Sequence, residues 1–247
     1  ISDINYDRMK DAMTAFSLIM KTHKVVNYRA CATSAMREAS NGSEVAKKLK
    51  IDTGVDIQII DGNDEASIIA STDLKHLISD NKTFLYVDVG GGSTEFTVFS
   101  NGKSIISKSF QLGTVRIIND MIRDTIWDEV KEWVTASTKE YSKVDLIGSG
   151  GNINSIYRFS EKKVGKPLSY FFLAKFYDRI RDLTYHERIF ELQMNPDRAD
   201  VIVPATRIYL SAMKWSKAKN IYVPKIGLAD GIIKSLYNEA IAKRTIV

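Results

Sequence analysis

The sequence predicts an α/β fold in which a three-stranded antiparallel meander opens the second half of the chain. Stretches with apolar residues three or four positions apart, typical of helices, alternate with short β-branched runs, typical of buried strands. Between residues 84 and 110, three strand-like runs follow one another with only turns between them. One of these turns is Asn101-Gly102, a strong two-residue hairpin signal.

The first half is predicted to alternate helices with two short strands. The segment 6–20 has the apolar spacing of a helix, and the β-branched stretch 25–33 is expected to form a buried strand. Ser34 has the residue type of a helix N-cap, with Arg37 and Glu38 in the first turn. The remaining predicted elements of this half are a helix at 43–49, a strand at 56–60 and a helix at 65–78.

The second half begins with the meander and then returns to helices separated by single strands. The predicted meander strands are 84–89, 94–99 and 104–110. A long helix at 197–215 is expected to bend at Pro204, because proline removes a helical hydrogen bond. The other predicted helices are 114–122, 126–141, 152–159, 173–183, 186–192 and 228–242, and the other predicted strands are 144–147 and 220–223.

Composition excludes several classes of protein. With 247 residues, 44% of them hydrophobic and only 4 prolines, the chain can bury one large or two ordinary cores and is not disordered. It has no apolar run long enough for a membrane span and no signal peptide pattern. The single Cys31 and three scattered histidines argue against disulfides and a Cys- or His-rich metal centre, so a reducing cytoplasm is expected. The net charge of +5 favours anionic partners, but no basic stripe indicates nucleic acid.

The most informative motif is the glycine-rich turn between the first two meander strands, 90–92. Three consecutive glycines let backbone amides approach a bound group closely. Because the turn joins strand to strand, it is neither a dinucleotide-binding fingerprint nor a Walker loop, both of which lead from a strand into a helix.

Asp88 precedes this turn and Glu95 follows it. If the hairpin closes symmetrically, the two carboxylates are cross-strand neighbours, and like charges in that position need a cation or a proton. Hard oxygen ligands beside a phosphate-binding turn suit Mg²⁺. The alternative is a plain glycine-rich hairpin with solvated acids. Gly113-Thr114 and Arg116, directly after the meander, are weaker candidates for the same site.

Three further features have both a functional and a plain structural interpretation. The loop 148–152 runs from a strand into a helix, where free amides form an anion site, although such loops are also simple connections. Arg37 is suited to bidentate phosphate binding, or it is a surface arginine paired with Glu38 or Glu44. Glu65 is a water-activating base, or it only complements the dipole of its helix.

Together these stretches resemble the exopolyphosphatases and guanosine pentaphosphate phosphohydrolases, the Ppx/GppA family. The resemblance covers almost the whole chain and implies the two-domain, ribonuclease H-like fold of actin, Hsp70 and sugar kinases. The matching stretches, in the family's order, are 32–37 with Asn41, 59–66, 87–95, 111–116, 148–153, 198–200 and 227–231.

The resemblance implies a bacterial, cytoplasmic hydrolase that releases terminal phosphate from inorganic polyphosphate with Mg²⁺, or the 5′ γ-phosphate of guanosine pentaphosphate. By resemblance, Glu65 is the catalytic base, Arg37 contacts substrate phosphate, and Asp88 and Glu95 are the metal-associated acids. The implied phosphate-binding loops are Gly90, Gly91, Gly92, Ser93 and Thr94, and Ser149, Gly150, Gly151 and Asn152.

The expected domain I spans 1–80, with the final helix, 231–247, packing on it, and domain II spans 81–230; substrate is expected in the cleft between them. Family members open with a strand hairpin that carries another phosphate loop, upstream of the position of Ile1. Domain I is therefore expected to be incomplete at its N-terminus. The chain otherwise resembles the short, two-domain members, and relatives are commonly homodimers.

Two other functions stay open. The first is an ATP-dependent kinase, because the superfamily that the chain resembles also contains such kinases. A non-catalytic sensor of polyphosphate or of a guanosine alarmone is the second alternative, because the first phosphate loop is expected to be missing. Without that loop, this chain alone is expected to be inactive. Neither a membrane nor nucleic acid is an expected partner.

Overall fold

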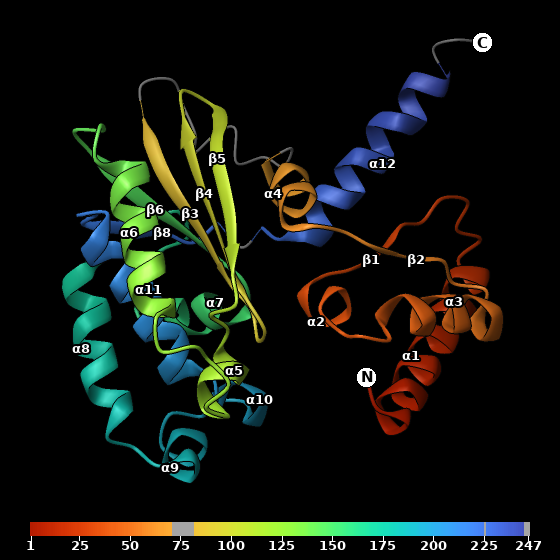
Figure 1. Cartoon of the computed structure of the whole chain (residues 1–247), viewed down its shortest axis with the longest axis horizontal. Helices are drawn as coiled ribbons and strands as arrows, with labels where there is room; N and C mark the ends of the chain where they lie inside the picture. The colour runs from red at the N-terminus through yellow and green to blue at the C-terminus, as the bar shows by residue number, and fades with distance from the viewer. Residues whose placement is uncertain (71–81, 225, 245–247) are drawn as a thin grey trace. The chain divides into compact units, whose positions relative to one another are not determined.

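The computed structural model describes residues 1–70, 82–224 and 226–244 (Figure 1). The chain divides into two compact units: Ile1–Ile69 with Leu228–Val247, and Ala70–Gly227. The predicted domain boundary at residues 80 and 81 lies outside the described residues.

The first unit is built on two short parallel strands, β1 (Ala30–Ala32) and β2 (Ile57–Ile59). Its apolar residues form two small clusters. One surrounds the fully buried Leu49, and the other joins Ile60 and Ile68 to Ile232. The helices of this unit are α1 (Asp3–Thr22), α2 (Ser34–Arg37), α3 (Gly42–Thr53), α4 (Gly62–Ala70) and α12 (Leu228–Arg244).

Three predictions for this unit need correction. The strand predicted at 25–33 is only three residues long, because its partner β2 offers only three residues, and Val26 is 90% exposed. Ser34 is the first residue of α2 rather than its N-cap, and its hydroxyl donates to Glu38 (2.8 Å). The helix predicted at 65–78 begins at Gly62, and its part beyond residue 70 lies outside the described residues. The final helix begins at Leu228, as predicted for the helix at 228–242.

The second unit contains a six-stranded mixed sheet in the order β5-β4-β3-β6-β8-β7. The predicted meander is confirmed, since β3 and β4 and then β4 and β5 pair antiparallel. Asn101 and Gly102 both have positive φ (50° and 74°), as a two-residue hairpin turn requires. The strands are β3 (Thr83–Val89), β4 (Thr94–Ser100), β5 (Lys103–Phe110), β6 (Val144–Ser149), β7 (Leu168–Ser169) and β8 (Asn220–Tyr222).

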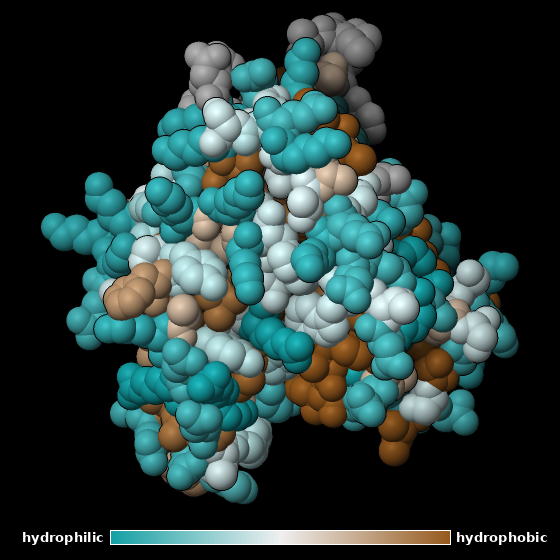
Figure 2. All heavy atoms as spheres, turned by 60° about the vertical axis from the view of Figure 1, so that its left-hand side comes forward, coloured by the Kyte–Doolittle hydropathy of each residue, from teal (hydrophilic) through white to brown (hydrophobic). Residues whose placement is uncertain are grey.

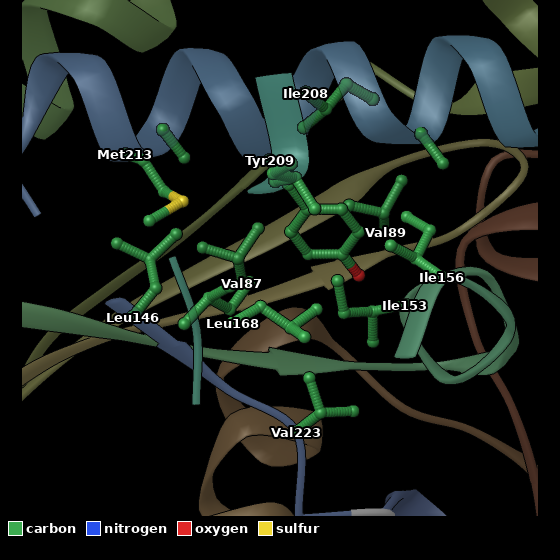
Figure 3. Close-up of a cluster of buried hydrophobic side chains, with 14 of the residues drawn as sticks. Val87, Val89, Leu146, Ile153, Ile156, Leu168, Ile208, Tyr209, Met213 and Val223 are labelled. Atoms are coloured by element: carbon green, nitrogen blue, oxygen red, sulfur yellow. The ribbon is translucent and has the colours of Figure 1, made fainter. Parts of the chain in front are cut away.

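The main hydrophobic core of the second unit lies between this sheet and its helices. Tyr209 and Met213 of α11 lie against Val87 and Leu146 of the sheet (Figure 3). On the face that Figure 2 brings forward, hydrophilic side chains cover most of the surface. The helices are α5 (Thr114–Ile118), α6 (Ile126–Thr138), α7 (Gly151–Arg158), α8 (Tyr170–Arg181), α9 (Tyr185–Phe190), α10 (Pro196–Ala199) and α11 (Ile202–Trp215).

The long helix predicted at 197–215 is two helices, α10 and α11, separated at Asp200 and Val201. Pro204 lies in the first turn of α11 rather than in the middle of a helix, at a position where backbone N–H groups have no helical acceptor. The strand β7 was not predicted, since two residues show no periodicity. Within the described residues, no helix is long and apolar enough to cross a membrane.

The buried position of Leu146 predicts a large cost of truncation. Leu146 on β6 is 0% exposed, whereas Leu18 on α1 is 60% exposed. Leu146→Ala is expected to lower the free energy of unfolding by about 2–5 kcal/mol, because it leaves a cavity under α11. Leu18→Ala, the matched control, is expected to change it by less than about 0.5 kcal/mol. Chemical denaturation measures both; equal effects would contradict the assigned core.

Candidate functional site

A row of polar side chains crosses four neighbouring strands of the sheet. The strand register places Ser109 of β5 opposite Glu95 of β4, Glu95 opposite Asp88 of β3, and Asp88 beside Ser149 of β6. The predicted cross-strand pairing of Asp88 with Glu95 is therefore confirmed. The row lies where β3 and β6 end, so it brings both predicted phosphate loops to one edge of the sheet.

The carboxylates of Asp88 and Glu95 have different surroundings. Burial, and then the negative charge of Glu95, raise the pKa of Asp88 to about 6. The Tyr86 hydroxyl donates to Asp88 Oδ2 (3.2 Å). Glu95 is buried, and its Oε1 accepts from the hydroxyls of Ser93 and Ser109. Hydroxyl groups thus satisfy part of the hydrogen-bonding capacity of the two carboxylates, and the pair is still suited to binding a cation.

These donors fit one kind of metal. Among the described residues, no group of three or more His, Cys, Asp or Glu side chains could hold an ion, so a closed protein-only site is not present there. Mg²⁺ binds through one or two carboxylates and keeps water and phosphate oxygens as its other ligands. Asp88 and Glu95 are a suitable donor set for it.

The glycine loop turns its carbonyls to one side. The carbonyl oxygen of Gly90 accepts from Thr114 N (3.0 Å), that of Gly91 from Val115 N (2.9 Å), and that of Gly92 from Arg116 Nε (2.8 Å). The described peptides are all trans, so the N–H in each of these peptide units points opposite to its carbonyl. Three N–H groups, those of residues 91, 92 and 93, therefore point away from α5.

These three N–H groups are available to a ligand. In the described part of the chain, none of them donates to a backbone carbonyl. Converging amide donors of this kind form an anion-binding concavity. Thr94, predicted to bind phosphate, is fully buried, and its hydroxyl donates to Leu112 O, so it secures the base of the loop.

The loop keeps this orientation because α5 packs tightly against it. A Cβ on Gly113, the residue before α5, would overlap the carbonyls of Gly91 and Gly92. The sequence placed Gly113, Thr114 and Arg116 near the site. Their part in orienting the peptides was not predicted, because it depends on contacts between separate segments.

The second loop is also shaped by close approach. Gly150 has φ +95°, which favours glycine, and a Cβ there would lie 3.0 Å from Asp88 Oδ1. Ser149 is anchored from both ends: its carbonyl accepts from the Tyr209 hydroxyl (2.7 Å), and its Oγ donates to Ile226 O (3.1 Å). Asn152 is buried in the first turn of α7, and its Oδ1 has no hydrogen-bond partner among the described residues. The helix α7 begins two residues after Ser149, the register neighbour of Asp88, and a helix N-terminus favours an anion.

Arg198 adds a positive charge to this loop, a contribution that sequence reasoning missed. Its guanidinium from α10 lies against Gly151, with Nη2 2.7 Å from the position that a Cβ would occupy. Asp197 is its ion-pair partner at 3.6 Å. The stretch 198–200 matched the family, but only the fold shows that the arginine reaches the α7 N-terminus.

The other two predicted residues, Arg37 and Glu65, belong to the first unit. Arg37, at the end of α2, donates from Nη1 to the carbonyl of Ile60, directly after β2 (2.9 Å). Glu65 is 8% exposed in the first turn of α4, whereas its neighbour Asp64 is exposed. An acid that only complements a helix dipole needs no burial, so the buried carboxylate favours the functional interpretation.

The raised pKa of Asp88 predicts a pH-dependent stability. Between its ordinary value of 3.8 and about 6, the folded state keeps a proton that the unfolded state has lost, so stability falls as the pH rises through this window. Asp88→Asn removes this pH-dependent loss of stability, because asparagine does not ionise. In a chelator-containing buffer it is expected to be more stable than the original protein by about 1–2 kcal/mol at pH 7.5, and equally stable at pH 3.5. Denaturant titrations at the two pH values measure it.

The prediction is contradicted if the difference in the free energy of unfolding between the two proteins is the same at both pH values. As a control, added Mg²⁺ at pH 7.5 is expected to stabilise the original protein more than Asp88→Asn, since a ligand stabilises the state that binds it.

The packing of Gly113 predicts a loss of anion binding on substitution. Gly113→Ala is expected to weaken binding of tripolyphosphate by about tenfold or more, because the new methyl group displaces the peptides of the glycine loop. Gly227→Ala is the matched control, since a Cβ there meets nothing within 4 Å. Isothermal titration calorimetry gives both affinities; unchanged binding by a folded Gly113→Ala protein would refute the assigned loop.

Comparison with known proteins gives a consistent family. The profile of the Ppx/GppA phosphatase family matches residues 1–240. Exopolyphosphatase 1 of Mycobacterium leprae is 22% identical, over 95% of this chain and 75% of the relative. The guanosine-5'-triphosphate,3'-diphosphate pyrophosphatase of Aliivibrio fischeri is 22% identical over 96% of this chain, which spans about half of that relative (51%).

Solved structures share the fold. An exopolyphosphatase from Cytophaga hutchinsonii has a TM-score of 0.83, with 23% identity over 97% of this chain and 84% of the other. The Aquifex aeolicus member of the Ppx/GppA family has a TM-score of 0.75, with 21% identity over 97% and 83%. The predicted fold class is thereby confirmed. The chain belongs to the Ppx/GppA phosphatase family.

Proposed function

We propose that this phosphatase releases terminal phosphate from inorganic polyphosphate, with Mg²⁺ as its cofactor. The observation that carries the proposal is the set of three outward N–H groups at residues 91–93 beside the acidic pair Asp88 and Glu95. Amide donors attract phosphate oxygens, and the adjacent acids repel them unless a cation lies between. A phosphate chain with bound Mg²⁺ satisfies both groups.

Phosphoryl transfer needs mainly positioning and charge neutralisation, and the second unit supplies donors for both. The glycine loop, the amino end of α7 and the Arg198 guanidinium are proposed to bind successive phosphate oxygens. Asp88 and Glu95 would hold Mg²⁺, which when bound supplies Lewis-acid neutralisation of phosphate charge. A linear anhydride presents regularly spaced oxygens to such an array.

Glu65 is proposed to accept the proton of the attacking water, and Arg37 to contact substrate phosphate. The resemblance to the family supports both roles, and the burial of Glu65 supports the first. A carboxylate that is withdrawn from bulk water is a better proton acceptor, because burial disfavours its charged form. The P–O bond to the leaving phosphate breaks as the new P–O bond to water forms, and orthophosphate is released.

Guanosine pentaphosphate is the second candidate substrate. It is favoured by the similarity to the Aliivibrio fischeri enzyme, whose name states a pyrophosphatase acting on guanosine-5'-triphosphate,3'-diphosphate. The same donors would bind its 5′ triphosphate. A cytoplasmic location, supported by the single Cys31, and a homodimer complete the proposal.

The proposal predicts the effect of removing the base. Glu65→Gln is expected to lower the rate of phosphate release from polyphosphate by about 10²–10⁴-fold, because the amide cannot accept the proton of water. The measurement is orthophosphate release in Mg²⁺ buffer, with guanosine pentaphosphate as the competing substrate.

Asp64→Asn is the matched control, since Asp64 is the exposed acid next to Glu65 in the same helical turn. It is expected to keep the original rate. Undiminished release by Glu65→Gln would rule out Glu65 as the base, and release only from guanosine pentaphosphate would replace the first substrate by the second.

A further inference from the structure

Arg188 of α9 is a half-buried arginine that binds only main-chain carbonyls in the described structure. It donates from Nε to Ile180 O (3.0 Å), from Nη1 to Ala199 O (2.8 Å) and from Nη2 to Leu183 O (2.7 Å). One planar guanidinium thereby joins the end of α8, the connection that follows it, and the end of α10. Burial lowers the pKa of Arg188, a cost that three charge-assisted hydrogen bonds offset.

The helix that carries Arg188 is fixed at its start. Thr184 and Glu187 form a capping box, in which Thr184 N donates to Glu187 Oε2 (2.6 Å) and Glu187 N donates to Thr184 Oγ1 (3.3 Å). This reciprocal pair satisfies two N–H groups that a short helix otherwise leaves open. Arg188 therefore extends from a helix whose first turn is held.

The helix that Arg188 holds is weak by itself. α10 has four residues and no side-chain hydrogen bond at its N-cap. Its last residue, Ala199, accepts the bond from Arg188, and the residue before it is Arg198, whose guanidinium lies against Gly151 at the start of α7. The Arg188 bond is thus one residue away from the arginine that reaches the second phosphate loop.

We propose that Arg188 is a positioning residue for phosphate binding, which holds α10 so that the Arg198 guanidinium stays over the N-terminus of α7. The inference rests on the proposed function, in which Arg198 contacts substrate phosphate. A lysine at 188 keeps the charge but has a single ammonium group, which cannot reproduce a planar fork with three fixed directions. α10 then loses its anchor while the net charge of the loop is unchanged.

A double-mutant cycle separates this role from a general structural one. The variants are Arg188→Lys, Arg198→Lys and both together, each in the Glu65→Gln background so that bound tripolyphosphate is not hydrolysed. Arg188→Lys is expected to raise the Kd for tripolyphosphate about tenfold when Arg198 is present, and by less than about twofold when Arg198 is already lysine. Isothermal titration calorimetry in Mg²⁺ buffer measures all four affinities.

The opposite outcome is an equal loss from Arg188→Lys in both backgrounds, or no loss in either, and each would overturn the proposal. Arg181→Lys is the matched control, because Arg181 forms an exposed ion pair with Asp178 on the same unit, and it is expected to leave Kd unchanged. If Arg188→Lys lowers the unfolding midpoint, Thr184→Ala replaces it, since this change weakens the start of α9 at an exposed position. It should show the same dependence on Arg198, and independence would again overturn the proposal.

Failure of the proposed function has a different signature. A protein that binds tripolyphosphate but releases no orthophosphate from it contradicts the hydrolase, while the binding cycle still tests Arg188. A protein that hydrolyses polyphosphate and gives additive effects contradicts only the role of Arg188.

Discussion

The constraint on which the site depends is the placement of two carboxylates opposite each other in one sheet. Asp88 and Glu95 are register partners on β3 and β4, and both are withdrawn from bulk water to a large extent. Such a pair is unfavourable without compensation. Neighbouring hydroxyls supply part of it, because Ser109 on β5 donates to Glu95 and Tyr86 on β3 donates to Asp88. A proton or a cation would supply the remainder, and this is the physical basis for proposing a ligand site at this edge of the sheet.

The amide groups around the pair have the opposite preference. Peptides of the glycine loop turn their carbonyls toward α5 and their N–H groups away, and α7 begins beside Asp88 with further N–H groups. Acids attract cations and amides attract anions, so neither a cation alone nor an anion alone satisfies all the groups at this edge of the sheet. A phosphate chain with a divalent cation carries both charges in one ligand, which is the physical reason why the fold suits a phosphoanhydride hydrolase.

Two arginines of the second unit bind main-chain carbonyls. Arg116 holds the carbonyl of Gly92, and Arg188 holds three carbonyls around α10. Each arginine holds in place a short segment, the glycine loop or α10, that has few hydrogen bonds of its own. Loops that must present peptide groups at a fixed angle cannot use a helix or a sheet for rigidity, and a planar guanidinium fork supplies it instead.

The sequence by itself determined the meander, the Asn101-Gly102 turn, the opposition of Asp88 and Glu95, and the family, because each depends on residues close together in the chain or on a motif. Local signals failed where partners decide the outcome: the strand at 25–33 was shortened by its short partner β2, and Pro204 sits in a helix start instead of at a bend.

Only the tertiary structure decided which way the loop peptides face and which arginine reaches α7. The bond from Arg116 to Gly92 joins residues 24 positions apart, and that from Ser149 to Ile226 joins residues 77 apart. A hydrogen bond between such distant residues leaves no periodic trace in the sequence, so its direction is fixed by packing alone.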